Sequence, residues 1–334
     1  MNEQIDFKKA GFPSRESYEF PNIVNIEVYR GKCFCNCVHC PVGITPPADR
    51  NERFGEESID VGLYKKIVSE ISQHPHSTVR IHSVGEPLIW KDIVEALKFT
   101  KDSGVYSWIF TCAATKDVKL LEDICDNTSI VEVSVNSTDS QNYIDTKGID
   151  AFDMVSDNIK HMHEYIKDKK LSTRLIASRV ESEDILKDQG FIMYWNSSGL
   201  LDDVFVRSHH TYNAIIDELP SEKTAHKHEP CLVHWARFNI NTRGDAAVCF
   251  NEFFKKELDE SLIYGNLKEH TIQEIWHGPK LTALRRAELS GDYSNIPFSK
   301  NLPCIDCYSC QPLFGNKQTS EHQIKNPGGA QNDN

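Results

Sequence analysis

Residues 29–43 read YRGKCFCNCVHCPVG and contain three cysteines in a CxxxCxxC pattern, Cys33, Cys37 and Cys40. Three thiolates at this spacing can hold three irons of a cubane cluster and leave the fourth iron open. Cys35 lies inside the loop and is not needed by the pattern. Because His39 stands beside the last cysteine, the loop alone also leaves a tetrahedral zinc site as an alternative.

Around this loop, apolar runs alternate with stretches of helical periodicity. The predicted strands are 23–28, 78–84, 106–113, 129–137, 171–180 and 203–209, and the predicted helices are 60–74, 91–103, 117–126, 151–169 and 181–200. Six strands, the first five each followed by a helix, predict a parallel α/β sheet with right-handed crossovers, a partial (β/α)6 barrel similar to a TIM barrel. A doubly wound Rossmann-like sheet is the alternative, but it would be favoured by a glycine-rich turn where this chain has cysteines.

The segment between the cysteine loop and the first predicted helix is rich in breakers. Residues 41–59 contain Pro41, Pro46, Pro47 and Gly55. Proline inside a helix removes a hydrogen bond and clashes with the preceding turn. This segment is therefore predicted to be a loop that covers the cluster, without regular helix.

The last third of the chain changes pattern after a polar linker at 211–230. Strands over 232–242 and 246–253 are predicted to form a hairpin around the turn at 242–245. A helix over 271–290 follows. The cysteines of this part are Cys231, Cys249, Cys304, Cys307 and Cys310. A zinc site is an alternative here too.

The first loop resembles the cluster loop of the radical S-adenosylmethionine (radical SAM) superfamily, although His39 stands where that family usually has an aromatic residue. The resemblance implies a 4Fe–4S cluster on Cys33, Cys37 and Cys40, whose open iron is chelated by the methionine part of SAM. An electron from the cluster would then cleave SAM to a 5'-deoxyadenosyl radical.

The last third resembles the SPASM/twitch extension of radical SAM enzymes, which implies a small α+β iron-sulfur domain. The number of cysteines fits one auxiliary 4Fe–4S cluster. Its implied ligands are Cys231, Cys249, Cys304 and Cys307, with Cys310 as the alternative fourth ligand. Full ligation by thiolates leaves no open iron, which suits electron transfer.

The family resemblance also implies contacts to SAM. Residues 83–88, SVGEPL, resemble the GGEP segment of the superfamily with Val84 in place of the first glycine. Gly85 and Glu86 would meet the ammonium of SAM, because a carboxylate at a strand end can bind a fixed cation. Further implied contacts are Thr111, Ser134, Asn136 and Arg174.

Side-chain alternation on two strands predicts which residues face the lumen. On strand 129–137 the valines would meet the helices, and Ser134 and Asn136 would point inward. On strand 203–209 the inward set would include Arg207 and His209. Either of these could orient hydroxyls or accept a proton, and a solvated edge strand is the alternative.

Composition limits the partners. The 334 residues carry a formal net charge of -12, and no basic stripe for nucleic acid is visible. An acidic surface suits a cationic small molecule, although net charge does not describe a pocket. There is no apolar run long enough for a membrane span, and the charged N-terminus is unlike a signal peptide, so we expect a cytoplasmic protein with free cysteines.

The expected organisation is a lead-in over 1–22, a radical SAM partial barrel over 23–212, the auxiliary cluster domain over 213–315 and a disordered tail over 316–334. The resemblance extends to the radical SAM dehydrogenases of aminoglycoside biosynthesis. It implies an oxidoreductase that abstracts hydrogen from a sugar or aminocyclitol, with oxidation, epimerisation or dehydration following, and an electron donor such as flavodoxin or ferredoxin. The alternatives are a radical SAM maturase of a ribosomal peptide and a non-enzymatic iron-sulfur or zinc regulator.

Overall fold

The computed structural model describes residues 12, 14–213, 215–217 and 230–307. One ten-stranded sheet runs through the described chain in the order β10-β9-β8-β1-β3-β4-β5-β6-β7, and β2 pairs with β1 outside this path. The strands are β1 (Ile23–Arg30), β2 (Glu57–Ser58), β3 (Thr78–Val84), β4 (Tyr106–Thr111), β5 (Ile130–Ser134), β6 (Arg174–Val180), β7 (Asp203–Arg207), β8 (Arg237–Ile240), β9 (Asp245–Ala247) and β10 (Ile263–Asn266).

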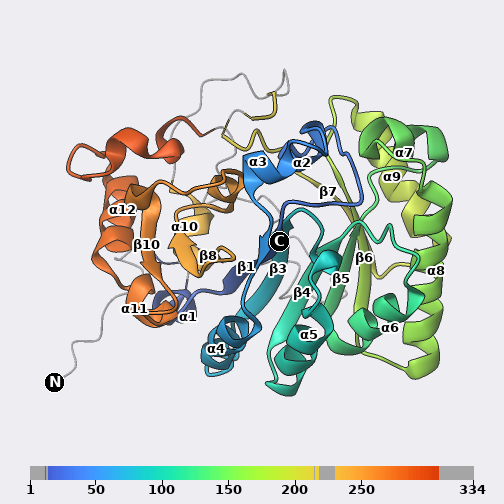
Figure 1. Ribbon diagram of the computed structural model, residues 1–334, viewed down its shortest axis with the longest axis horizontal. Helices are drawn as coiled ribbons and strands as arrows, with labels where there is room; N and C mark the ends of the chain where they lie inside the picture. Colours follow the sequence, from blue (N-terminus) through green and yellow to red (C-terminus); the bar gives the residue numbers. More distant parts are fainter. Residues whose placement is uncertain (1–11, 13, 214, 218–229, 308–334) are drawn as a thin grey trace, which may run out of the picture.

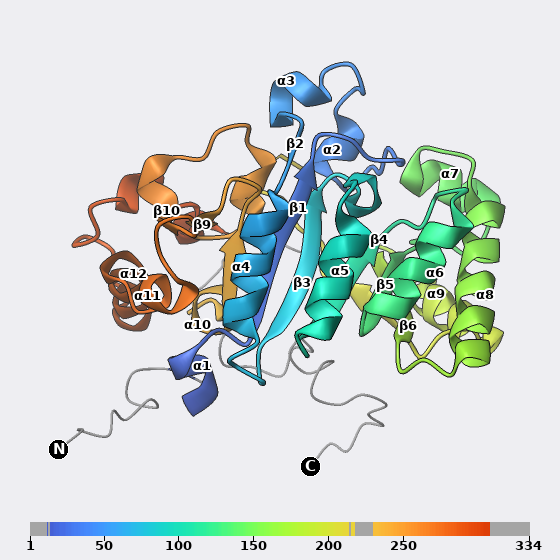
Figure 2. The same cartoon turned by 60° about the horizontal axis from the view of Figure 1, so that its bottom comes forward.

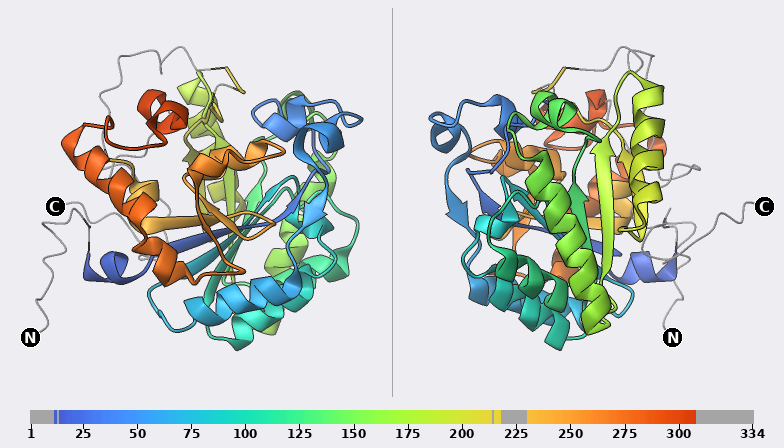
Figure 3. Two further views of the ribbon diagram at one scale, coloured as in Figure 1. Left: turned by 60° about the vertical axis from the view of Figure 1, so that its left-hand side comes forward. Right: turned by 90° about the vertical axis from the view of Figure 1, so that its right-hand side faces the viewer.

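Figures 2 and 3 show helices along the outer face of the curved sheet, where they cover its apolar side. The α-helices are α1 (Arg15–Glu19), α2 (Pro41–Ile44), α3 (Arg50–Phe54), α4 (Val61–Ile71), α5 (Ile93–Asp102), α6 (Val118–Asn127), α7 (Ser140–Lys147), α8 (Phe152–Lys169), α9 (Ile185–Ser198), α10 (Leu232–Ala236), α11 (Ile272–Trp276) and α12 (Pro279–Ser290). Four of them begin after an aspartate that accepts a backbone N–H of the first turn, Asp60, Asp117, Asp139 and Asp184. Such caps fix where each helix leaves its strand.

The predicted parallel α/β sheet is confirmed. Strands β1, β3, β4, β5, β6 and β7 pair in parallel and in sequence order. Because parallel strands place their carboxyl ends at one edge, the segments that follow β1, β3, β4, β5 and β7 meet there. This edge is where the cysteine loop lies (Figure 1).

Three local predictions are wrong. Residues 41–59 are not all loop, because they contain α2, α3 and β2, and Pro41 is tolerated at the first position of α2. The strand predicted over 232–242 begins as α10, and the strand predicted over 246–253 is replaced after β9 by a 3-10 helix, Phe250–Phe254. The helix predicted over 271–290 is divided into α11 and α12, because Pro279 starts a new helix after Gly278.

The sheet continues across the boundary that was predicted at residues 212 and 213. Strand β8 pairs in parallel with β1, and β9 and β10 extend the sheet in antiparallel fashion. The predicted C-terminal unit is therefore attached to the barrel by backbone hydrogen bonds.

A buried ion pair strengthens this attachment. The guanidinium of Arg30 donates to both carboxylate oxygens of Glu27 at 3.0 Å, and both side chains are at most 2% exposed. Arg30 also donates to the carbonyl of Phe54 at 3.2 Å and to that of Phe253 at 2.9 Å. One side chain thus joins β1, α3 and the C-terminal part.

In the part of the chain that the structure describes, no helix has both the length and the apolar composition needed to cross a membrane.

Candidate functional site

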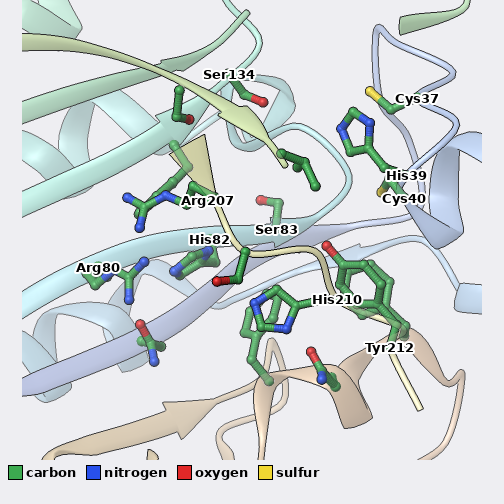
Figure 4. A pocket seen from close by; sticks show the side chains of 18 of the residues that line it. Cys37, His39, Cys40, Arg80, His82, Ser83, Ser134, Arg207, His210 and Tyr212 are labelled. Carbon is green, nitrogen blue, oxygen red and sulfur yellow. The ribbon is translucent and has the colours of Figure 1, made fainter. Parts of the chain in front are cut away.

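A cavity of about 450 Å³ lies at the carboxyl edge of the sheet, between the barrel and the C-terminal part. Its walls come from the cysteine loop, the ends of the parallel strands and the C-terminal cysteines. Figure 4 shows one group of lining side chains at Cys37, His39 and Cys40 and another around Arg80, His82 and Arg207. Ligand sites commonly have this size and position.

The three cysteines of the first loop line the cavity together. The loop is fixed by Arg50, which donates to the carbonyl of Cys33 at 3.4 Å and to Asn36 Oδ1 at 2.5 Å. The loop also folds tightly over Gly43, where an added Cβ would lie 2.2 Å from the carbonyl oxygen of Cys37. Glycine is thus required at residue 43 for the loop to close.

The chemistry of this loop fits an iron cluster. Burial raises the pKa of the Cys40 thiol to about 11. A bound cation favours the charged form of a buried thiol, and cluster iron would supply that charge. The residues present therefore fit the three-cysteine cluster that the family resemblance implies.

Two further thiols lie at the same place. Cys35 and Cys112 line the cavity, and the ligand atoms of Cys33, Glu86 and Cys112 lie within 4.8 Å of one another. Cys112 follows β4, so parallel pairing brings it to the cysteine loop. No spacing pattern in the sequence predicts this approach, because Cys33 and Cys112 are far apart along the chain.

Gly85 and Glu86 lie directly after β3, on the cavity wall. Gly85 has φ +144° and an added Cβ would lie 2.1 Å from the carbonyl oxygen of Lys32, so only glycine fits. The carboxylate of Glu86 accepts from Thr111 Oγ1 at 2.6 Å and from the backbone N–H of Cys112 at 3.0 Å. Burial raises the pKa of Glu86, and a bound cation would stabilise its charged form.

Of the four other predicted SAM contacts, two line the cavity and two do not. Thr111 and Ser134 line the cavity. Asn136 has φ +64° and its amide oxygen accepts from the backbone N–H of Val180 at 2.7 Å, and it is not among the lining residues. Arg174 begins β6 at the opposite edge of the sheet, with Nη2 4.0 Å from Asp203 Oδ2, so the structure does not bring it to the cavity.

Lys147 was missed from the sequence. It ends α7, is 1% exposed and donates from Nζ to Ser134 Oγ at 3.1 Å. Burial lowers its pKa, but the neighbouring thiols raise it more, so the net shift is upward. An ammonium group beside the cysteine loop suits the carboxylate of a bound amino acid. A single lysine on a polar helix gave no such signal in the sequence.

Arg207 lies in the cavity, as alternation on its strand predicted. Its Nε donates to Glu132 Oε1 at 2.9 Å and its Nη2 donates to Glu132 Oε2 at 2.5 Å. Its guanidinium carbon also lies 4.5 Å from the ring centroid of Phe205. The two parallel bonds fix the position of the guanidinium, and because arginine does not lose its proton in proteins, Arg207 is excluded as a proton acceptor.

His209 does not follow the predicted alternation. Strand β7 ends at Arg207, and the backbone N–H of His209 donates to Glu181 Oε1 at 2.7 Å. His210 lines the cavity in its place (Figure 4). Burial lowers the pKa of His210 to about 4, with a further contribution from Arg237, so its imidazole is neutral at neutral pH.

Four C-terminal cysteines line the same cavity, namely Cys231, Cys249, Cys304 and Cys307. Cys304 Sγ lies 3.8 Å from His234 Nε2, and the other ring nitrogen of His234 lies 2.7 Å from Glu288 Oε1. Glu288 also accepts from the indole N–H of Trp235 at 2.7 Å. Through His234, this buried hydrogen-bonded network contacts one of the four cysteines, Cys304. The alternative ligand Cys310 lies outside the described residues.

Comparisons with known proteins agree with this geometry. Residues 231–310 match the family model SPASM, described as an iron-sulfur cluster-binding domain. The chain is 21% identical over 283 residues to S-adenosyl-L-methionine-dependent 2-deoxy-scyllo-inosamine dehydrogenase of Niallia circulans, a match that covers 84% of this chain and 92% of that protein. The resemblance predicted from the two cysteine groups is thereby confirmed.

Solved structures show the same fold. The crystal structure of BtrN in complex with AdoMet and 2-DOIA has a TM-score of 0.54 at 18% identity, and the match covers 88% of this chain and 95% of BtrN. The crystal structure of Streptococcus suis SuiB bound to precursor peptide SuiA has a TM-score of 0.63 at 14% identity, covering 84% of this chain and 69% of SuiB. The predicted barrel with a C-terminal iron-sulfur domain is confirmed at the level of fold.

Proposed function

We propose that this chain is a radical SAM oxidoreductase that abstracts a hydrogen atom from a carbon of a sugar-like small molecule. The observation that carries the proposal is the convergence of two cysteine groups, Glu86 and a polar barrel lumen on one cavity. The similarity to 2-deoxy-scyllo-inosamine dehydrogenase, whose printed name specifies a SAM-dependent dehydrogenase of an aminocyclitol, supports this class of reaction.

The residues at the cysteine-loop end of the cavity would bind the cluster and SAM. Cys33, Cys37 and Cys40 would hold the cluster whose open iron receives SAM. Glu86 would bind the ammonium of SAM, and Lys147 with Ser134 would bind its carboxylate. When the 4Fe–4S cluster and SAM are bound, the cluster supplies the electron that cleaves SAM to methionine and a 5'-deoxyadenosyl radical, which takes hydrogen from the substrate.

The chain must then remove a proton and an electron if the outcome is oxidation of an alcohol. His82 and His210 line the lumen and are neutral, because burial lowers the pKa of both. A neutral imidazole can accept the hydroxyl proton, which Arg207 cannot. Cys231, Cys249, Cys304 and Cys307, with Cys310 as the alternative ligand, would hold an auxiliary 4Fe–4S cluster, which would supply an electron acceptor. An external donor such as flavodoxin or ferredoxin would supply the initiating electron.

A second candidate is a radical SAM maturase of a ribosomal peptide. It is favoured by the likeness to SuiB, which was solved with its precursor peptide. A peptide substrate would give the same 5'-deoxyadenosine but a cross-linked or modified peptide as product. A non-enzymatic regulator would form no 5'-deoxyadenosine.

The proposal is tested by the products of anaerobically reconstituted protein with SAM and dithionite. We expect the wild-type chain to form 5'-deoxyadenosine, and the Cys37→Ala variant to form none because the open iron site is lost. Cys249→Ala should retain cleavage but lose coupled product. Cys125→Ala is the matched control, because Cys125 is buried in α6 and does not line the cavity. Equal cleavage by the Cys37→Ala variant would contradict the assignment.

A further inference from the structure

A second group of metal-ligating side chains lies at the cavity, beside the cysteine pattern. The sulfurs of Cys33 and Cys112 and a carboxylate oxygen of Glu86 all lie within 4.8 Å of one another. Among the described residues, the sulfurs of Cys33, Cys37 and Cys40 do not form such a group. The second group therefore shares only Cys33 with the pattern and takes its other two ligands from distant parts of the chain.

The spacing of this second group suits a single metal ion. Ligand atoms around a tetrahedral ion such as Zn²⁺, with bonds of about 2.0–2.3 Å, lie about 3.5–3.8 Å apart, so a contraction of at most about 1 Å would bring the three atoms around one ion. In a cubane cluster each iron takes its own thiolate, so the ligands of a cluster are spread more widely. Two different kinds of metal site are thus arranged around Cys33.

Parallel strand pairing brings the three ligands together. Cys33 follows β1, Glu86 follows β3 and Cys112 follows β4, and these strands are neighbours in the sheet (Figure 2). All three side chains line the cavity, where Glu86 is 2% and Cys112 is 6% exposed. Burial of this kind limits the access of water to a bound ion.

The carboxylate of Glu86 is fixed by hydrogen bonds to its neighbours. Its Oε1 accepts from Thr111 Oγ1 at 2.6 Å and from the backbone N–H of Leu88 at 3.3 Å. Its Oε2 accepts from the backbone N–H of Cys112 at 3.0 Å. Because an ionised carboxylate can accept at about four lone-pair positions, it can still bind a metal ion. Hydrogen bonds that orient a ligating carboxylate are typical of metal sites.

The backbone that follows Cys112 is strained. Ala113 has φ +52°, a left-handed conformation that is unfavourable for a residue with a Cβ. Its N–H donates to Thr111 Oγ1 at 2.9 Å, and its carbonyl accepts from Asn158 Nδ2 of α8 at 2.8 Å. These contacts hold the turn in place and keep Cys112 beside Glu86. Strained backbone that its surroundings hold in place is concentrated at functional sites.

We propose that, in the chain without its clusters, Cys33, Glu86 and Cys112 bind one Zn²⁺ ion, with water as the fourth ligand. Two thiolates and a carboxylate are ligands that zinc accepts, and an open fourth position is common at buried zinc sites that face a cavity. The ion and the first cluster exclude each other, because both require Cys33. This inference goes beyond the proposed function and does not depend on it.

The test is the zinc content of the full chain, prepared without clusters under anaerobic and reducing conditions, saturated with Zn²⁺ and freed of excess zinc by gel filtration. We expect Cys112→Ala to carry one zinc fewer per chain than the wild type. Cys40→Ala changes the cysteine pattern but not the proposed site, so it should carry as much zinc as the wild type. Cys125→Ala, a buried position of α6 away from the cavity, is the matched control and should also be unchanged. Zinc at the C-terminal cysteines contributes equally to all four chains.

Two further measurements do not depend on the folding of Cys112→Ala. In the wild type, Cys33 and Cys40 are both partly exposed, and peptide mass spectrometry measures how fast each is alkylated. Zn²⁺ should slow the alkylation of Cys33 by about tenfold or more and leave that of Cys40 within about twofold, because only the sulfur of Cys33 binds the ion. Glu86→Gln keeps an acceptor for Thr111 and should raise the Kd for this zinc by about tenfold or more. Far-UV circular dichroism reports that each variant is folded.

Equal zinc contents of the wild type and Cys112→Ala, loss of the same zinc in Cys40→Ala, or equal protection of Cys33 and Cys40 would overturn the proposal. Because clusters and SAM are absent, these outcomes do not depend on cleavage of SAM. A chain that binds this zinc but forms no 5'-deoxyadenosine after reconstitution would contradict the proposed function and leave the zinc site intact.

Discussion

At the scale of single residues, the site depends on glycines that let the backbone of one loop touch another. Gly43 closes the cysteine loop against Cys37, and Gly85 lets the turn after β3 meet Lys32. The backbone N–H of Glu86 donates to the carbonyl of Lys32 at 2.9 Å, so this contact also orients the carboxylate at the cavity. The turn that carries Glu86 is therefore held against the start of the cysteine loop at Lys32.

Substitution of Gly85 by alanine tests this link. The added Cβ would lie 2.1 Å from the carbonyl oxygen of Lys32, and φ would be strained at +144°. We expect a loss of about 2–4 kcal/mol in the free energy of unfolding, together with poor iron loading. Urea unfolding of the metal-free chain measures the first, and iron analysis measures the second.

The matched control for this variant is Gly104→Ala. Gly104 has φ +70°, and nothing lies within 4 Å of an added Cβ. We therefore expect Gly104→Ala to lower the free energy of unfolding only by the backbone strain, about 1 kcal/mol. Equal destabilisation by the two variants would contradict a role for the close approach to Lys32.

Glu86→Gln tests the proposed ammonium contact. Glutamine keeps a carbonyl oxygen for Thr111 but removes the charge. We expect the Kd for SAM to rise by about tenfold or more, because a hydrogen bond to a charged group contributes about 1.5–3 kcal/mol. The measurement is SAM binding by equilibrium dialysis of the reconstituted protein at unchanged iron content. An unchanged Kd would remove Glu86 from the ammonium site.

At the scale of elements, the sequence predicted the alternation of strands and helices because a parallel sheet with one covered face repeats a simple pattern. It failed where short elements depend on tertiary contacts. The run 232–236 is apolar at every position except His234 and has strand character, yet it forms α10, whose Trp235 donates to Glu288 of α12. No local pattern encodes that contact.

For the candidate site too, the sequence predicted residues that belong to a local pattern and missed residues that only tertiary contacts bring to the cavity. Cysteine spacing identified the first group, since Cys33, Cys37 and Cys40 lie in one loop, whereas the C-terminal group was predicted from the family resemblance, because its cysteines are far apart in the sequence. Arg80 and His82 alternate with Val79 and Ile81 on β3, so the alternation applied to 129–137 could have found them. Arg237 and Asn239 alternate with Phe238 and Ile240 on β8 in the same way, although this strand was predicted to start five residues too early.

Arg30 joins β1, α3 and the C-terminal part, so substitution of this residue tests the junction. Arg30→Met leaves Glu27 buried without its partner. We expect a loss of about 3–5 kcal/mol in the free energy of unfolding, because an uncompensated buried charge is costly. Arg15→Met is the control, since the exposed pair of Arg15 with Glu19 contributes at most about 1 kcal/mol. Urea unfolding under anaerobic conditions compares the two, and similar losses would contradict the role of the buried pair.

At the scale of the whole molecule, the barrel and the C-terminal part enclose one cavity that both cysteine groups line. The acidic net charge suggested a cationic substrate, but the described lining has more cations than carboxylates. The net charge sums all residues of the chain, on the surface and in the interior. The charge of the cavity lining therefore could not be predicted from it. In the proposed function, this shared cavity would let the substrate lie between the site that takes hydrogen and the site that takes an electron.

The proposed function requires that Cys33, Cys37 and Cys40 hold a cluster with an open iron that receives SAM. Electron paramagnetic resonance of the anaerobically reconstituted, reduced Cys249→Ala variant tests it most directly, because the signal of the first cluster is then observed with the auxiliary group disrupted. We expect about eight irons per chain in the wild type and a signal of the variant that changes shape when SAM is added. Colourless protein that contains zinc, or a cluster signal that SAM leaves unchanged, would contradict it.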